Sequence, residues 1–133
     1  MDVFFADDSK QDAPSRAGMK ALVAAGGMRI KSANVQTLEK ELVVICNKYG
    51  FPEGEKFKWS PGRELWMAKE LINERRKAFF TDVLASAKKN SALAVAVIED
   101  TQYDPIDKNS PSREFDVAKV LLERIHLLFC SDK

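Results

Sequence analysis

A short apolar run that ends on two carboxylates is the feature that most constrains the fold of this chain. Every side chain from Leu93 to Ile98 is apolar, and half of them are β-branched. A run this short between polar flanks is typical of a strand buried on both faces of a sheet. Glu99 and Asp100 follow at once. In open α/β sheets ligands gather at the carboxyl ends of strands, because crossover helices cover both faces. We therefore expect a functional edge here.

A second apolar strand, at residues 3–6, also ends on an acidic pair, Asp7 and Asp8. Mg²⁺ is a hard ion that prefers carboxylate and water oxygens, and two such ions about 3.5 to 4 Å apart can clamp a phosphodiester during cleavage. Side chains alternate along a strand, so one member of each pair should point at the site. We select Asp7 and Asp100 as ligands for Mg²⁺ or Mn²⁺, with Glu99 as the rival. The alternative is that all are solvated strand-end carboxylates.

The remaining pattern predicts an α/β fold with the element order β-β-α-β-α-β-α. Expected strands are at residues 2–6, 22–30, 56–59 and 93–98, and expected helices at 35–49, 62–89 and from 110 onward. The first two strands are separated only by a polar connection at 7–18, so we expect them to be antiparallel. Strands joined through helices must run parallel to some neighbour, which makes the sheet mixed. Gly26-Gly27 indicates a bulge or a close backbone approach.

Residue types at the ends of the expected helices set their boundaries. Asn34 can cap the first helix, and Gly50 follows it where a left-handed residue is favoured. Ser60-Pro61 is a typical helix start. The second helix is long, so we expect a kink near Lys77.

Basic and aromatic residues alternate at 56–59, where Lys58 precedes Trp59, and Arg63 follows. This combination can contact a phosphate backbone and stack a base, so we expect nucleic acid to bind through Lys58, Trp59 and Arg63. The competing interpretation is that Phe57 and Trp59 face the core while the lysines face water. The formal net charge of +1 provides no overall field for nucleic acid, although a local basic groove is compatible with it.

Composition bounds the class of protein. At 133 residues, 45% hydrophobic and 31% charged, the chain is about the size of one domain, 1–133. Cys46 and Cys130 have no C-x-x-C spacing, which indicates reduced thiols and a cytoplasmic protein. No apolar run reaches the roughly 18 residues that span a bilayer, so we expect no membrane association. The single His126 cannot support a zinc cluster, and no Walker loop or dinucleotide fingerprint is present.

The chain is still apolar from Leu127 to Cys130, three residues before it stops at Lys133. We interpret the chain as the front part of a longer protein, with a domain that is incomplete at its C-terminal end. A second copy could also cover such a surface, so a homodimer is a further expectation.

Several short segments together resemble one family. The opening VFFADDSKQ is similar to the hydrophobic-Asp-(Glu/Asp)-Ser start of the uncharacterised domain-of-unknown-function family thirty-eight-hundred, whose members are classed as ribonuclease H-like. The likeness continues through LVAAGG, the Phe-Lys-Trp segment at 57–59, the helix segment RKAFF at 76–80 and the strand that closes on Glu99-Asp100.

This resemblance implies a metal-dependent nuclease fold whose first catalytic carboxylate matches Asp7 and whose second matches Glu99 or Asp100. Such folds usually complete the metal site from a later helix, which this sequence does not reach. The expected function is therefore a Mg²⁺- or Mn²⁺-dependent nuclease or phosphoryl-transfer enzyme. The alternative is a non-catalytic α/β module that binds a protein or nucleic acid.

Overall fold

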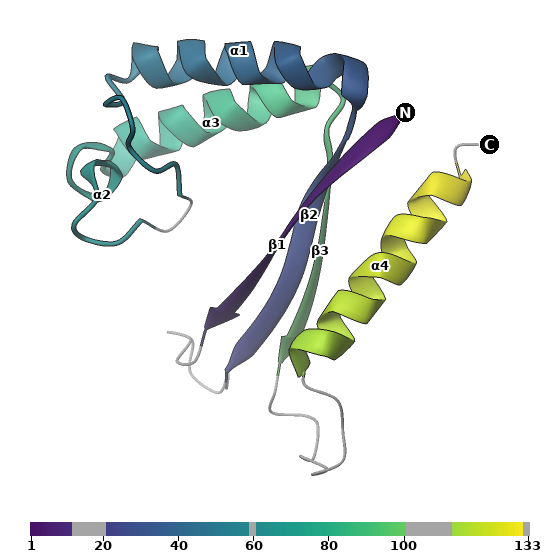
Figure 1. Cartoon of the computed structure of the whole chain (residues 1–133). Helices are drawn as coiled ribbons and strands as arrows, with labels where there is room; N and C mark the ends of the chain where they lie inside the picture. Colours follow the sequence, from purple (N-terminus) through teal and green to yellow (C-terminus); the bar gives the residue numbers. More distant parts are fainter. Residues whose placement is uncertain (12–20, 59–60, 101–112, 132–133) are drawn as a thin grey trace. The chain divides into compact units, whose positions relative to one another are not determined.

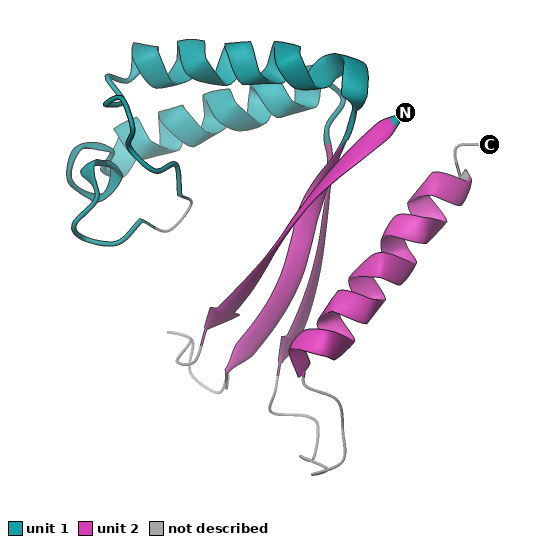
Figure 2. Ribbon diagram, in the orientation of Figure 1, with its two compact units in different colours: residues 1, 30–92 teal, residues 2–29, 93–133 magenta. Residues whose placement is uncertain are grey.

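The computed structural model describes residues 1–11, 21–58, 61–100 and 113–131 of the chain (Figure 1). Its elements are β1 Asp2–Gln11, β2 Leu22–Lys31, α1 Ser32–Lys48, α2 Trp66–Glu70, α3 Asn73–Lys89, β3 Leu93–Asp100 and α4 Arg113–Ser131. The protein is thus a mixed α/β structure. It divides into two compact units, unit 1 with residue 1 and residues 30–92, and unit 2 with residues 2–29 and 93–133 (Figure 2).

Unit 2 contains a three-stranded antiparallel sheet of order β1-β2-β3. The expected antiparallel pairing of β1 with β2 is confirmed, whereas the expectation that β3 runs parallel to a neighbour is wrong. β3 pairs antiparallel with β2, from Leu22 opposite Asp100 to Arg29 opposite Leu93. The helices between β2 and β3 therefore leave and re-enter the sheet at neighbouring residues. They are inserted between two antiparallel neighbours, β2 and β3, in the way that a long loop connects the strands of a hairpin. This connection is not a crossover, so β3 does not have to run parallel to β2.

Two glycines allow the strands of this sheet to approach closely, as the sequence predicts. A Cβ at Gly26 would lie 2.9 Å from the carbonyl oxygen of Val95 in β3, and one at Gly27 would collide with the carbonyl of Phe5 in β1. The backbones of β1 and β3 thus occupy the space that side chains at these two positions of β2 would need. β1 continues to Gln11, so the predicted end at residue 6 is wrong. An edge strand tolerates polar side chains because much of it faces water.

The core of unit 2 lies between the sheet and α4, which packs along β3 (Figure 1). Its buried residues are Val23, Ala25, Val117 and Leu121, with Phe4, Val95, Val97 and Ile125 partly buried around them. β3 is not buried on both faces as predicted, because Ile98 is 66% exposed. The helical spacing of the sequence also predicts an apolar face of α4 through Phe115, Ala118, Leu122, Ile125 and Phe129. Ile125 does pack against the core, but the other four residues are exposed, so this prediction is wrong for most of the face. α4 is apolar on more than one face, and packing on β3 selects the face of Val117.

Unit 1 is built on α1 and α3, which lie side by side (Figure 1). Met67, Leu71, Phe79 and Phe80 are buried at its centre. Aromatic rings surround them, and Tyr49 meets Phe79 edge-on at 5.3 Å between ring centroids. Rings in this geometry add to the burial of apolar area, so unit 1 has a dense aromatic core.

The helix boundaries of unit 1 differ from the predicted ones. α1 begins at Ser32, directly after β2, and its N-cap is Lys31. Asn34 is therefore not the cap, and its side-chain amide donates to the carbonyl of Asn90 at 2.9 Å. The predicted long helix breaks between α2 and α3, where Leu71 turns into the core with 1% exposed, and not near Lys77.

Two further predictions in unit 1 have different outcomes. Gly50 has φ of +73°, as expected after a helix end. The strand predicted at 56–59 does not form at residues 56–58, which belong to no helix or strand. Trp59 and Ser60 lie outside the described residues.

Candidate functional site

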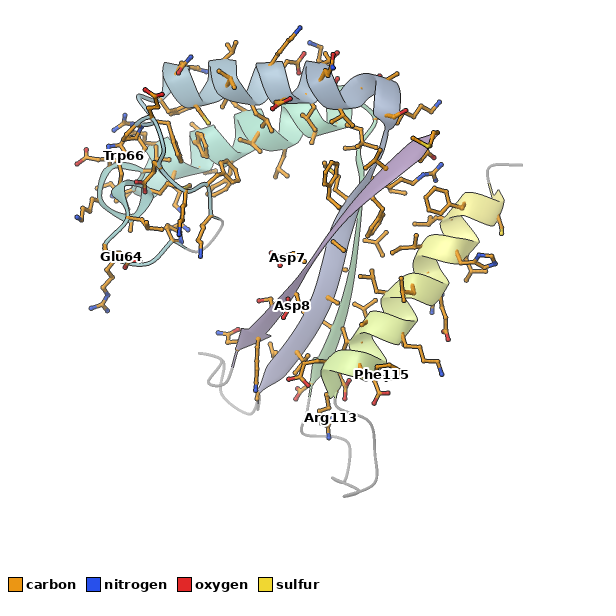
Figure 3. The ribbon with its side chains drawn as sticks, viewed as in Figure 1. Asp7, Asp8, Glu64, Trp66, Arg113 and Phe115 are labelled. Carbon is orange, nitrogen blue, oxygen red and sulfur yellow. The ribbon has the colours of Figure 1, made fainter. Side chains whose placement is uncertain are left out.

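The alternation of side chains assigns the β1 carboxylates to opposite faces of the sheet. Phe4 packs into the core beneath α4, and Lys10 forms an ion pair with Glu114 of α4 at 3.9 Å. Even-numbered residues of β1 therefore face α4, which gives Asp8 to that face. Asp7 lies on the opposite face, and both carboxylates are exposed (Figure 3).

The same argument separates the carboxylates at the end of β3. Val95 and Val97 pack beneath α4, and Glu99 forms an ion pair with Arg113 in the first turn of α4. Both side chains of this pair are largely buried, so the pair fixes the start of α4 against β3. Asp100 lies on the opposite face of the sheet, the face that also carries Asp7. The expected partners thus share a face, and the rival Glu99 is held by a cation.

Sharing a face does not bring Asp7 and Asp100 to one ion. β2 lies between their strands, so their backbones are separated by two strand spacings, roughly 9.5 Å. They also differ in level, because the carbonyl of Phe5 lies against Gly27, whereas Asp100 pairs with Leu22 at the other end of β2. Among the described residues, no three His, Cys, Asp or Glu side chains gather in a metal-binding group.

Asp7 itself remains accessible as a single ligand. Its Oδ1 accepts from the backbone amide of Asp8 at 3.0 Å, which orients the carboxylate. The face around it is exposed, with Phe5 at 50% and Ile98 at 66%. A large polar substrate could therefore approach this face of unit 2.

The residues expected to bind nucleic acid belong to unit 1. Lys58 and Arg63 have exposed side chains, and the backbone amide of Lys58 donates to the sulfur of Met67 at 3.3 Å. Phe57 stacks near Phe51, with 6.4 Å between ring centroids. Phe57 touches Phe79 on one side, with 5.6 Å between ring centroids, yet 48% of it is exposed. The interpretation in which Phe57 packs inward therefore holds only in part, while Lys58 and Arg63 do face water. Trp59 lies outside the described residues.

A polar network between α1 and α3 was not singled out from the sequence. Glu41 of α1 accepts from the hydroxyl of Ser86 at 2.6 Å and from the side-chain amide of Asn90 at 3.0 Å. It also accepts from Lys89 at 2.5 Å. The hydrogen bonds of Lys89 and Ser86 hold the pKa of Glu41 below its ordinary value.

The other end of the network is centred on Asp82 of α3. It accepts from Lys48 at 2.7 Å and from the hydroxyl of Tyr49 at 2.9 Å. The hydrogen bond from Lys48 lowers the pKa of Asp82, and the same contact raises the pKa of Lys48. Burial is the main cause that raises the pKa of Tyr49.

Helical spacing could have revealed this network. A Glu and a Lys stand seven residues apart on α1, and an Asp and a Lys stand seven apart on α3, so antiparallel helices bring each acid to the other helix's lysine. Between them lies a groove of about 520 Å³. Because each acid is matched by a lysine, we interpret the network as a clamp between the helices.

A second groove, here the β3–α4 groove, has a volume of about 460 Å³. It is lined by Val95, Ala96, Val97, Val120, Arg124, Leu127 and Leu128. The groove is mainly apolar, with Arg124 as its charged side chain, and lies beside β3, which is at the edge of the described sheet.

Comparisons with known proteins assign nothing to these sites. No family model, no curated protein and no solved structure matches the chain. Within the described part of the chain, no helix has the length and apolar character needed to cross a membrane.

Proposed function

We propose that unit 2 is a ribonuclease H-like sheet that acts in metal-dependent cleavage or transfer of phosphodiesters, with Asp7 as its first metal ligand. The observation that carries the proposal is the exposed carboxylate of Asp7 within β1, on the sheet face opposite α4. The resemblance of the opening strand to a ribonuclease H-like family supports the same choice. The substrate would be nucleic acid.

The chemistry of Asp7 fits Mg²⁺ or Mn²⁺ as a partial site. Mg²⁺ commonly keeps several waters and binds through one or two carboxylates together with substrate phosphates. One exposed Asp can therefore begin such a site. A bound ion would supply Lewis-acid stabilisation of the phosphoryl oxygens. Asp100 lies too far from Asp7 to share its ion, so we assign Asp100 a separate contact with metal or substrate on the same face.

The test is calorimetric titration of Mn²⁺ into wild type, Asp7→Asn and Asp8→Asn. Asp8 is the matched control, because it is the next residue, is also an aspartate and lies on the opposite face of the sheet. We expect Asp7→Asn to abolish binding and Asp8→Asn to retain it. Full binding by Asp7→Asn would remove Asp7 from the site, and loss in Asp8→Asn alone would move the site to the face beneath α4. Asp100→Asn should keep Mn²⁺ binding but reduce cleavage of DNA or RNA substrates.

A second candidate function is a non-catalytic module that binds a protein or nucleic-acid partner. The apolar β3–α4 groove favours it, because such a surface is typical of interaction sites. The two candidates differ in their response to metal. A wild-type protein that binds no Mn²⁺ and cleaves neither DNA nor RNA would favour the binding module.

A further inference from the structure

The two edges of the sheet in unit 2 differ in their protection against pairing. β1 carries Asp2, Asp7, Asp8 and Lys10, and charges along an edge strand discourage another strand from adding to it. β3 has no charge and no proline from Leu93 to Ile98. Its outer edge is therefore suited to pair with another strand.

One flank of α4 lies beside this edge. Arg113, Asp116, Val120, Arg124 and Leu127 follow the spacing of a single helical stripe. Arg113 pairs with Glu99 of β3, and three others line the β3–α4 groove. Because Arg113 lies at the end of β3 and the groove reaches back to Val95, α4 runs antiparallel to β3.

This stripe is symmetric about its centre. Asp116 stands four residues before Val120, and Arg124 stands four residues after it. If two copies of the stripe meet in antiparallel fashion about Val120, each Asp116 faces Arg124 of the other copy. A two-fold interface makes this kind of reciprocal contact, in which the same patch serves both subunits.

We propose that the β3 edge is the interface of a symmetric homodimer. β3 of one copy pairs antiparallel with β3 of a second copy, which extends the sheet from three strands to six. The two-fold axis stands perpendicular to the sheet, so both α4 helices lie on the same face, side by side and antiparallel. Val120 meets its counterpart at the axis, flanked by two Asp116–Arg124 ion pairs.

The strand pairing is compatible with the charges of β3 itself. Glu99 and Asp100 stand at one end of β3, and the apolar Leu93 and Ala94 stand at the other. Antiparallel pairing places the acidic end of each strand across from the apolar end of its partner, so like charges do not oppose one another. A second copy of the chain presents Arg124 to Asp116 and Asp116 to Arg124, whereas an unrelated peptide would match this arrangement only by chance. We therefore propose a second copy as the occupant of this edge.

The first test is sedimentation velocity over a range of protein concentrations. Arg124→Asp and Asp116→Arg should each weaken the dimer by roughly tenfold or more, because each places like charges together twice. The double variant with both changes exchanges the charges and should restore wild-type dimerisation. Lys119→Glu, an exposed charge reversal about 100° around α4 from Val120 and outside the stripe, is the matched control and should weaken the dimer far less than either reversal within the stripe. A wild type that stays monomeric at every concentration would overturn the proposal.

The second test detects the axis directly. Val120→Cys in a Cys130→Ser background should form an intermolecular disulfide under mild oxidation, because the two thiols meet at the two-fold axis. Lys119→Cys in the same background should remain largely monomeric on non-reducing gels. A dimer that ignores the charge reversals and crosslinks equally through position 119 would place the interface elsewhere.

Discussion

The two units have cores of different kinds. In unit 1 the centre contains large aromatic side chains, with Phe79 at 0% and Phe80 at 7% exposed. Among the described residues of unit 2, the buried core consists of smaller aliphatic side chains, such as Val117 and Leu121. Both units leave large apolar side chains exposed, so the difference between them lies in the size of the enclosed side chains at the centre.

The largest expected effect is the loss of the aromatic centre of unit 1. Phe79→Ala should lower the free energy of unfolding by about 3–5 kcal/mol, because it removes a fully enclosed ring. Phe115→Ala in α4 is the matched control, since this ring is 59% exposed, and it should cost less than about 1 kcal/mol. Urea denaturation followed by circular dichroism measures both. Equal losses would erase the contrast between the units.

A neighbouring pair of leucines sharpens the comparison within unit 2. Leu121→Ala should cost about 2–3 kcal/mol, because Leu121 is buried in a small core that can relax around a cavity. Leu122→Ala, one residue away and 66% exposed, should cost less than about 0.5 kcal/mol in the monomer. The same denaturation experiment applies. A larger loss for Leu122→Ala would mean that α4 packs through the face predicted from sequence.

The polar clamp of unit 1 predicts a smaller effect that depends on pH. Glu41 and Asp82 have lowered pKa values in the folded protein. They contribute stability above their unfolded values, ordinarily 4.5 and 3.8, and this contribution is lost as pH falls through the lower folded values. Lys48 has a raised pKa, so its contribution is full below its ordinary 10.5 and is lost as pH rises through the folded value.

Stability measured from pH 7 down to pH 2 tests this clamp. Glu41→Gln and Asp82→Asn should flatten the acid decline in the free energy of unfolding. Glu39→Gln is the control, because Glu39 is an exposed glutamate on the same helix, and it should leave the curve unchanged. If the free energy of unfolding falls with pH in both clamp variants as it does in wild type, the acid decline must come from other titratable groups.

The sequence predicted local features better than tertiary arrangement. Residue periodicity located β2, α1 and β3, and Gly26-Gly27 correctly indicated close strands. Direction and burial of β3 were wrong, because an apolar run does not reveal whether the helices before it form a crossover or an insertion between antiparallel strands. The predicted face of α4 was right for Ile125 and wrong for Phe115 and Leu122, because several faces of this helix are apolar and the packing on β3 selects one of them.

The candidate site shows the same limit. Strand alternation predicted that one member of each acidic pair points at the site, but no local pattern could show that β2 lies between the strands of Asp7 and Asp100. The clamp of unit 1 depends on the pairing of two distant helices. The sequence contains the four charged residues, but only the folded structure shows that Glu41 pairs with Lys89 and that Lys48 pairs with Asp82.

The most direct test of the central claim is the amide spectrum of isotope-labelled protein with substoichiometric Mn²⁺, because this paramagnetic ion broadens the signals of nearby amides. The proposal predicts early loss of signals around Asp7 in β1 and around Gly27 in the adjoining part of β2, with those near Glu41 and Asp82 unchanged. Broadening centred on Glu41 and Asp82, or spread evenly over the exposed carboxylates, would contradict a metal site on the sheet of unit 2.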